Sequence, residues 1–364
     1  MTKPIKIFAF PTHCTKTTTP GVDYVRILLP MKELAKDKRF KVHFYKNTLK
    51  KPLTWQDWDR AAKEYDILYI NYLTLPWDFS LVGMLFRKYG KKIVFDIDDL
   101  IWDIQEDNSS YGTYAPGSEG RAVVTDIIRE ADYVTCTNTF LKNGIAAYCQ
   151  KPHEKIEVFP NYIDLKLYNW RATPRKSHKV RIGYFGSSSH FNDLADKNFV
   201  QAMEKLMGEY PNLEFVTIGA MIQQFKKKFG MRYFNDFGHQ DIYTWVKMFP
   251  EKLGEIDIFA VPLVDTTYCR AKSSIKALEM GSTMKPVVFQ SIRQYNELVI
   301  DGANGYLASS AKEWYEKLKR LIDRPDERER VGKNLFETIK KDWTMDNPKN
   351  IGKYVRFFEK VMAS

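Results

Sequence analysis

Residues 256–289 read IDIFAVPLVDTTYCRAKSSIKALEMGSTMKPVVF and contain the pattern that decides the fold. Two apolar runs in this stretch predict β-strands, and the segment between them has the length and spacing of a short α-helix. A strand, a helix and a second strand form a βαβ unit, which is the building block of parallel sheets. We expect the strands at 256–261 and 286–290 and the helix at 273–280, with Gly281 placed to end the helix.

The start of this helix combines several features of an anion-binding site. Ser273 and Ser274 favour a helix start, where unpaired N–H groups and the positive end of the helix dipole attract negative charge. Arg270 and Lys272 add two cations just before it. These features predict a bound phosphate, with Glu279, two turns further along, able to accept paired hydrogen bonds from a ribose diol. An ordinary capped surface helix is the competing interpretation.

The same alternation of short apolar runs and helical patterns continues along the whole chain, which predicts an α/β fold with parallel sheets. With 364 residues the chain is longer than one core usually serves. Residues 161–179 are polar and basic and show no period, so we expect a linker there. We therefore predict two doubly wound domains that face each other across a cleft, at 1–160 and 180–345. A last amphipathic helix at 346–364 could cross back to the first domain.

Charge and cysteine usage restrict the partners and the compartment. The formal net charge of +11 suggests an acidic partner, such as nucleotide phosphates, nucleic acid, anionic lipid or an acidic glycan. The four cysteines are widely spaced, which fits free thiols in a reducing compartment and argues against a structural zinc site. The first residues lead directly into a strand without a signal-peptide pattern, and no apolar run approaches the roughly 18 residues of a spanning helix. We expect a cytoplasmic protein.

Four blocks resemble one known family in the same order along the chain. They are EVFPNYID (157–164), VRIGYFGSSSHFNDL (180–194), the stretch at 256–289 and YNELVIDGANGYLA (295–308). They resemble the retaining glycosyltransferases of the GT-B fold, in the group 1 or family-four class that includes sucrose and mannosyl transferases. The resemblance is specific over roughly residues 155–345 and weaker before them. It implies a GT-B fold, in which two Rossmann-like doubly wound domains face a cleft.

The resemblance implies a site for a nucleotide-diphosphate-sugar donor. Glu279 matches the second glutamate of the family's paired-glutamate motif, which binds the donor ribose. The first glutamate of that motif would fall at Ala271 and is missing, so the identity of the donor sugar stays open. Lys272, together with the backbone of Ser273 and Ser274, matches the cradle that holds the diphosphate.

Further donor-binding residues are implied by their position in the family's fold rather than by a motif. The family's other phosphate-binding base normally follows the first strand of the second domain, and this chain has no arginine there. His190 or Arg270 would then take its place. The backbone near the end of the next strand and at 237–239 would hold the nucleotide base. The residues implied in this way are Gly186, Ser187, His190, Gly219 and His239.

Two stretches of the first domain follow predicted strands and should therefore face the cleft. The long loop after the first strand ends at Gly21, which suits close approach of the backbone to a bound donor and equally suits a simple turn. His13 in that loop is either an acceptor contact or a structural histidine. The acidic run at 96–99 has three interpretations: a magnesium or manganese site, contact of Asp98 or Asp99 with the sugar or acceptor, or turn and capping chemistry.

The implied reaction needs little from the protein besides charge stabilisation. Transfer of a sugar from a nucleotide diphosphate leaves negative charge on the β-phosphate, and stabilising that charge lowers the barrier. Lys272, Arg270 and the helix start would do so without a metal, and Asp98 and Asp99 complete the candidate catalytic set. In the retaining mechanism that the resemblance implies, the leaving phosphate takes the acceptor proton, which agrees with the absence of a clear Asp/His pair in the sequence. The nucleotide sugar is a co-substrate, and no prosthetic group is implied.

The sequence leaves the acceptor open. Residues 223–234, QQFKKKFGMRYF, mix cations with aromatics, a pattern that suits nucleic acid, a membrane surface or an ordinary solvated face. Building a surface polysaccharide or glycolipid and glycosylating a modified base in phage-type DNA are both compatible with it. The alternative function is a nucleic-acid-binding protein on a degenerate, inactive transferase fold, which the substitution at Ala271 makes plausible.

Overall fold

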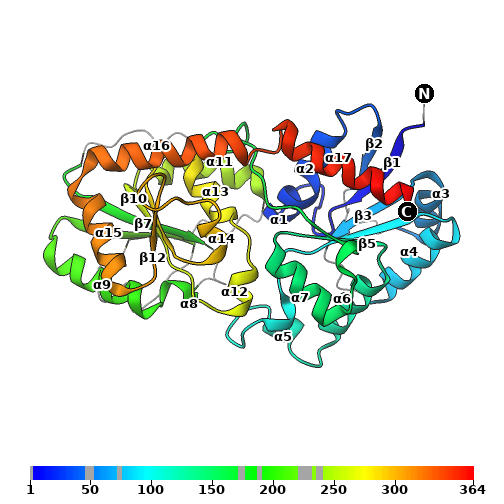
Figure 1. Ribbon diagram of the computed structural model, residues 1–364, viewed down its shortest axis with the longest axis horizontal. Coiled ribbons are helices and arrows are strands. Elements are labelled where there is room, and N and C mark those ends of the chain that lie inside the picture. Colours follow the sequence, from blue (N-terminus) through cyan, green and yellow to red (C-terminus); the bar gives the residue numbers. More distant parts are fainter. Residues whose placement is uncertain are drawn as a thin grey trace.

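Two six-stranded parallel sheets, each covered by helices, lie side by side in the computed structural model (Figure 1). The structure describes residues 3–45, 53–71, 76–170, 177–186, 191–219, 232–234 and 241–364. The α/β prediction, with two doubly wound sheets, is confirmed over these residues.

The first sheet has the strand order β2-β1-β3-β4-β5-β6. Its strands are β1 (Ile5–Phe10), β2 (Phe40–Phe44), β3 (Ile67–Asn71), β4 (Lys92–Asp96), β5 (Tyr133–Cys136) and β6 (Ile156–Val158). Its helical segments are α1 (Gly21–Asp23), a π-helical turn (Tyr24–Leu28), α2 (Leu29–Leu34), α3 (Trp55–Glu64), α4 (Pro76–Lys88), α5 (Tyr111–Tyr114), α6 (Glu119–Glu130) and α7 (Thr139–Cys149). Short 3-10 turns add Ile101–Asp103 and His153–Lys155.

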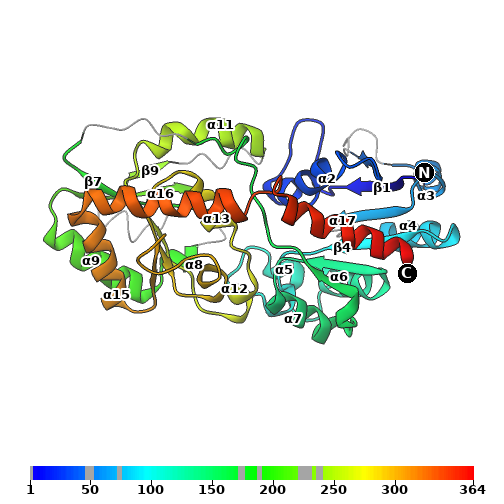
Figure 2. The same ribbon diagram turned by 45° about the horizontal axis from the view of Figure 1, so that its top comes forward.

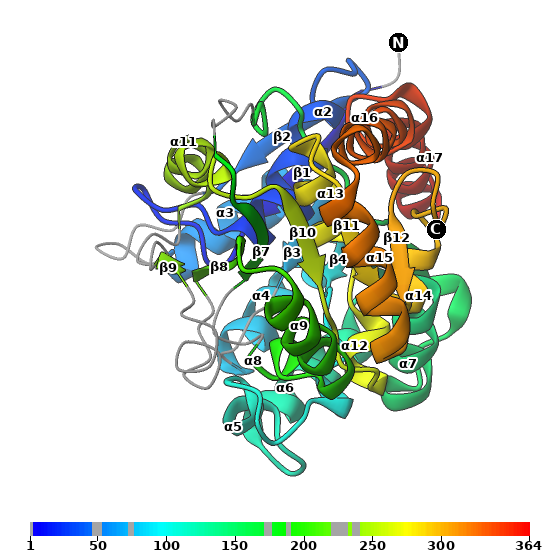
Figure 3. The same cartoon turned by 90° about the vertical axis from the view of Figure 1, so that its left-hand side faces the viewer.

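The second sheet has the order β12-β11-β10-β7-β8-β9, so β7 and β10 lie at its centre (Figure 3). Its strands are β7 (Val180–Gly186), β8 (Leu213–Gly219), β9 (Arg232–Phe234), β10 (Ile258–Val261), β11 (Val287–Gln290) and β12 (Tyr306–Ala308). Its helices are α8 (Phe191–Leu194), α9 (Lys197–Glu209), α11 (Ile242–Leu253), α12 (Thr267–Ala271), α13 (Ile275–Ser282), α14 (Arg293–Asn296), α15 (Ala311–Asp323) and α16 (Pro325–Asp342).

Alternating side chains of the second sheet build two separate layers of core. On one face, Tyr184 of β7 clusters with Phe199 of α9 and Trp314 of α15. On the other face, the next residue of β7, Phe185, meets Phe249 of α11, with ring centroids 4.8 Å apart. Successive side chains of a strand point to opposite faces, so helices on both sides can bury them. This sandwich fixes the carboxyl ends of β7 and β10, where the site lies.

Helix α13 differs from the prediction at both ends. It spans Ile275–Ser282 and begins after Ser274, which makes no side-chain capping hydrogen bond. Gly281 does not end the helix. A Cβ at Gly281 would lie 2.3 Å from Cδ1 of Ile339 in α16, so glycine allows the two helices to approach closely. The role predicted for Gly281 is therefore wrong, because long-range packing rather than the helix end requires it.

The last helix, α17 (Pro348–Ala363), continues from α16 and lies over the first sheet (Figure 2). Its Tyr354 stacks on Phe159, with ring centroids 3.9 Å apart, and its Phe358 meets Tyr69 of β3 edge-on. These aromatic side chains are buried, so residues late in the chain complete the core of the first sheet.

Two findings bear on environment. Among the helices of the described residues, none combines the length and the apolar character that crossing a bilayer requires. The four cysteines are buried and unbridged.

Candidate active site

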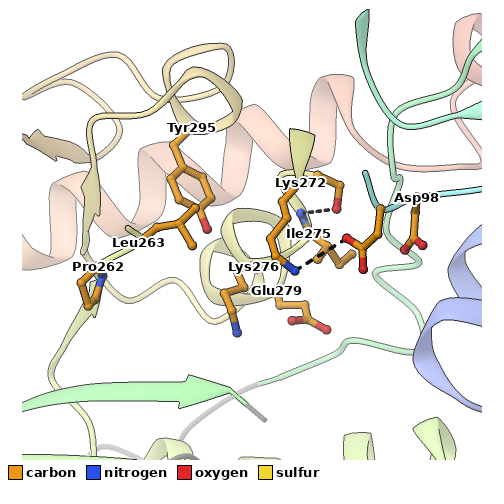
Figure 4. Close-up of a pocket in the computed structure, with 10 residues that line it drawn as sticks. Asp98, Pro262, Leu263, Lys272, Ile275, Lys276, Glu279 and Tyr295 are labelled. Atoms are coloured by element: carbon orange, nitrogen blue, oxygen red, sulfur yellow. Dashed lines mark hydrogen bonds and ion pairs between the residues drawn. The ribbon is translucent and has the colours of Figure 1, made fainter. Parts of the chain in front are cut away.

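A pocket of about 190 Å³ lies where α13 and the loop after β4 approach each other (Figure 4). Asp98 and Asp99 reach it from the first sheet, and all its other lining residues come from the second. The charged lining of the second domain comes from α13 and from the residues just before it. The second-domain lining is Pro262, Leu263, Lys272, Ser273, Ile275, Lys276, Glu279 and Tyr295.

Three charged side chains, those of Lys272, Lys276 and Glu279, line the pocket together because of their spacing. Lys272 precedes α13, and Lys276 and Glu279 lie on its first and second turns. Positions three and four residues apart lie on one side of a helix, so Lys276 and Glu279 both line the pocket (Figure 4). The sequence analysis missed Lys276, although its spacing from Lys272 and Glu279 was a usable signal.

Lys276 also ties α13 to the central strand of the sheet. Its Nζ donates a hydrogen bond of 3.0 Å to the carbonyl oxygen of Phe185, at the carboxyl end of β7. The next residue is Gly186, where a Cβ would lie 3.0 Å from the same Nζ. A cation from α13 therefore occupies the end of β7, the region where the family resemblance implied a phosphate-binding base.

Burial moves the pKa values of Lys276 and Glu279, the two charged side chains of α13, towards neutral pH. Burial lowers the pKa of Lys276 to about 8, against the opposing effect of Glu279. Burial raises the pKa of Glu279 to about 7, again against the effect of Lys276. Burial alone would lower the pKa of Lys272, but the neighbouring Asp99 carboxylate raises it above its ordinary value. Lys272 thus stays charged at neutral pH.

Asp99 crosses from the first domain to contact the segment before α13. Its Oδ2 accepts a 3.0 Å hydrogen bond from the hydroxyl of Tyr268, and its Oδ1 lies 3.7 Å from Nζ of Lys272. A phosphate bound to Lys272 would compete with this carboxylate for the same charge. Asp98 lines the same pocket (Figure 4).

The structure separates Asp96 from its two neighbours in the acidic run. Asp96 is buried and pairs with the guanidinium of Arg26 through two hydrogen bonds of 3.0 and 2.7 Å. Thr135 donates a third, of 2.6 Å. Asp96 therefore holds the core together and does not line the pocket. Within the described ranges, no group of three or more His, Cys, Asp and Glu side chains is arranged to hold a metal ion.

Arg270 is not brought to the pocket. It lies on α12, half-exposed, and its guanidinium forms two hydrogen bonds of 2.6 and 2.9 Å with Asp265. Of the two cations predicted before α13, Lys272 lines the pocket and Arg270 does not. The second lysine in the pocket is Lys276.

The predicted glycines occupy different places. Gly186 and Gly219 are register partners at the carboxyl ends of β7 and β8, and Gly219 has a φ of 90°, which favours glycine. Gly21 begins α1, and a Cβ added there would lie 3.9 Å from Cδ1 of Ile242 in α11, so this residue lies at a contact between the domains rather than in the pocket. The predicted residues Ser187, His190 and His239, and most of 223–234, lie outside the described residues.

The first domain also contains an Asp/His pair that the sequence analysis did not find. Nδ1 of His13 lies 3.3 Å from Oδ1 of Asp23, and the backbone N–H of His13 donates to Oδ2 at 2.8 Å. Hydrogen bonding to Asp23 raises the pKa of His13, although burial opposes it. The expectation that the chain lacks such a pair is therefore wrong.

Hydrogen bonds from the first domain fasten the segment before α13. Asn138, the N-cap of α7, donates through Nδ2 to the carbonyl oxygens of Ala271 at 2.6 Å and Lys272 at 3.3 Å. Asn161 donates to Oγ of Ser273 at 2.8 Å. The backbone beside the pocket is thus positioned by both domains.

Part of the chain matches a family model. Residues 179–324 match the model described as glycosyl transferases group 1, and these residues include the whole lining that the second domain contributes. No curated protein matches the sequence.

Solved glycosyltransferases share the fold over the full length of the chain. HepE of Anabaena, solved in complex with UDP and glucose, has a TM-score of 0.63 at 13% identity and covers 99% of this chain and 100% of its own. Sucrose-phosphate synthase of Thermosynechococcus elongatus has a TM-score of 0.62 at 13% identity, covering 100% of both chains. A glycosyltransferase of Rickettsia africae has a TM-score of 0.58 at 11% identity and covers 99% of both. The chain therefore has the GT-B fold with two Rossmann-like domains, and the resemblance of its second domain to the group 1 glycosyl transferases is confirmed.

Proposed function

We propose that this protein is a glycosyltransferase that moves a sugar from a nucleotide-diphosphate-sugar donor to an acceptor hydroxyl with retention of anomeric configuration. The observation that carries the proposal is the joint placement of Lys272, Lys276 and Glu279 in one pocket at the start of α13. The two lysines there suit a diphosphate, and the carboxylate suits a ribose diol. The shared fold with HepE, which was solved with UDP and with UDP-glucose, supports it.

In this proposal the protein acts mainly by stabilising charge. As the bond to the anomeric carbon breaks, negative charge develops on the β-phosphate, and Lys272 and Lys276 lie where they can neutralise it. The helix start at Ser274 adds the positive end of its dipole. The leaving phosphate then takes the proton of the acceptor hydroxyl, so this route uses no metal and no protein base. Asp98 and Asp99, which face these cations, would contact the sugar or the acceptor.

The acceptor and the location are inferred from the cysteines and the net charge. Four buried, unbridged cysteines support a reducing compartment, so we place the reaction in the cytoplasm. A glycan or glycolipid at an anionic membrane surface and a modified base of DNA both suit the net charge of +11. The loss of the family's first motif glutamate at Ala271, which is buried, leaves the donor sugar open.

A panel of nucleotide sugars tests this function. We expect one nucleoside diphosphate to raise the melting temperature, and Lys272→Ala or Glu279→Ala to weaken its binding by tenfold or more, about the value of a charge-assisted hydrogen bond. Arg270→Ala is the matched control: it removes a cation two residues away that is paired with Asp265 and should leave binding unchanged. Donor hydrolysis, followed by NMR of the released sugar, reports activity and anomeric outcome. Salt-sensitive DNA binding without any nucleotide binding or hydrolysis would instead support the inactive nucleic-acid-binding alternative.

A further inference from the structure

The charge of Lys272 is balanced by a carboxylate that comes from the other domain. Oδ1 of Asp99 lies 3.7 Å from Nζ of Lys272, and Oδ2 of Asp99 accepts a 3.0 Å hydrogen bond from the hydroxyl of Tyr268. The same Nζ lies over the ring of Tyr268, 4.7 Å from its centroid. The carboxylate and the cation are therefore held against one aromatic side chain of α12.

The backbone on both sides of this pair is anchored. Asp96, three residues before Asp99, is fixed by the guanidinium of Arg26, so the loop after β4 starts from a buried ion pair. The carbonyl oxygen of Lys272 accepts a hydrogen bond from Nδ2 of Asn138 at 3.3 Å. The side chains of Lys272 and Asp99 are only 23% and 33% exposed, so solvent and salt screen their attraction only in part. The pair is thus an ordered part of the pocket wall.

A phosphate that binds Lys272 is brought next to Asp99. Two negative groups at such a distance repel each other, and the repulsion grows with the charge of the ligand. The donor and the product of the proposed reaction differ in this charge. In the nucleotide sugar the β-phosphate is esterified, whereas in the released diphosphate it is free and carries about one negative charge more at about pH 8, because its second pKa is about 6. Asp99 therefore disfavours the product nucleotide more than the donor.

We propose that Asp99 is a specificity-determining residue: its carboxylate, held in place by Tyr268, competes with bound phosphate for Lys272 and thereby weakens binding of the nucleoside diphosphate product more than binding of the nucleotide-sugar donor. The inference rests on the proposed function and deepens it. It requires no contact between Asp99 and the sugar or the acceptor. As the diphosphate leaves, Asp99 pairs with Lys272 again, which favours product release.

Calorimetry on the full chain measures this preference. UDP-glucose, GDP-mannose, ADP-glucose and dTDP-glucose, and the nucleoside diphosphate of each, are titrated at about pH 8 in buffer without divalent metal, which would mask the phosphate charge. The proteins are wild type, Asp99→Asn, Lys272→Met and the double variant, so that a double-mutant cycle isolates the coupling between the two residues. Lys276 and Glu279 titrate near this pH, but they are unchanged in all four proteins.

Asp103→Asn is the matched control, because it removes a carboxylate from the same region of the first domain. Asp103 accepts a 2.7 Å hydrogen bond from the hydroxyl of Tyr148, and it is not among the described residues that line the pocket. Asparagine can accept the same hydrogen bond. We expect this variant to bind the diphosphate and the nucleotide sugar as wild type does.

We expect Asp99→Asn to bind the preferred diphosphate about tenfold more tightly than wild type and the matching nucleotide sugar about threefold more tightly. A damaged fold weakens binding, so it does not account for such a gain. In the Lys272→Met background the gain from Asp99→Asn should fall below about twofold, because no cation there holds the phosphate next to Asp99.

Three results would overturn the inference: an equal gain for both ligands, unchanged or weaker binding of the diphosphate by Asp99→Asn, and a full gain in the Lys272→Met background. A gain of the same size in Asp103→Asn would do so as well, since it would indicate a general effect of net charge. If neither wild type nor Asp99→Asn binds any nucleotide of the panel, the proposed function itself fails. Binding of a nucleotide sugar by wild type, without any gain in Asp99→Asn, defeats this inference alone.

Discussion

Lys276 and Glu279 are a pair of opposite charges whose burial costs both of them free energy. Burial brings the pKa of the lysine down to about 8 and that of the glutamate up to about 7, so each is close to losing its charge at neutral pH. A bound diphosphate would stabilise the charged lysine, and a ribose diol would satisfy the carboxylate. The protein is therefore less stable without a ligand than with one bound at this site. Perturbed pKa values of this kind cluster at functional sites.

Glu279→Gln tests whether burial of the charged carboxylate destabilises the folded protein. The folded-state pKa of Glu279 lies above its unfolded value of 4.5, so the native protein binds more protons between about pH 4.5 and 7. The free energy of unfolding therefore falls as pH rises through that window. We expect the ligand-free variant to match wild type near pH 4.5 and to be about 1–3 kcal/mol more stable near pH 8. Urea unfolding at the two pH values measures the difference in the free energy of unfolding between variant and wild type. A difference of the same size at both pH values would contradict this expectation.

At the scale of single residues, the sequence predicted the part of the site that depends on local pattern. Lys272 and Glu279 follow from the start and the period of one helix. Arg270 does not reach the pocket because Asp265, five residues earlier, binds its guanidinium. His13 and Asp23 meet only because the loop between them folds back, and spacing alone does not reveal such a contact.

At the scale of elements, the close approach of α13 to α16 sets where the pocket residues stand. Gly281 has the side chains of Leu335 and Ile339 directly above it, both fully buried. The predicted helix was placed two residues early, because a glycine needed for packing looks the same in sequence as one that ends a helix. Apolar alternation predicted the strands at 256–261 and 286–290, which the structure has as β10 (Ile258–Val261) and β11 (Val287–Gln290), but not the order of the strands, which depends on long-range contacts.

Gly281→Ala tests this packing. The added Cβ would lie within 3 Å of Ile339 and Leu335, so we expect a loss of about 1–3 kcal/mol in the free energy of unfolding and weaker nucleotide binding as α13 shifts. Gly208→Ala in α9 is the control, since a Cβ there meets no atom within 4 Å and should stabilise the helix by about 0.5–1 kcal/mol. Chemical denaturation and calorimetry measure both effects. Equal stability of the two variants would show that the helices tolerate the methyl group.

At the scale of the whole molecule, the contacts of Asn138 make the two domains one unit at the site. Its Nδ2 binds the backbone of Ala271 and Lys272, while its Oδ1 caps α7 by accepting from the N–H of Leu141 at 2.9 Å. One side chain therefore fixes a helix start in the first domain and the segment before α13 in the second. The linker predicted at 161–179 does not act alone in joining the domains.

Asn138→Asp separates these two roles. The carboxylate keeps the cap, which suits a helix start, and it keeps the 3.1 Å hydrogen bond that Oδ1 accepts from Nη1 of Arg293, but it cannot donate to the carbonyl oxygens of Ala271 and Lys272. We expect a larger radius of gyration in X-ray scattering and several-fold weaker nucleotide binding, with α7 intact by circular dichroism. Asn212→Asp is the control, because among the described residues the side chain of Asn212 donates to the carbonyl oxygen of His178 and to no residue of the first domain. An unchanged radius together with unchanged affinity would mean that other contacts hold the domains together.

The return of α17 to the first sheet has a consequence for biosynthesis. A ribosome releases the strands of the first sheet early, yet Tyr354 and Phe358, which fill its core, emerge only after the entire second domain. At about 5–20 residues per second, the nascent first domain waits some tens of seconds with that apolar face uncovered. During this interval the second domain can finish folding by itself, while the first is a natural client for chaperones.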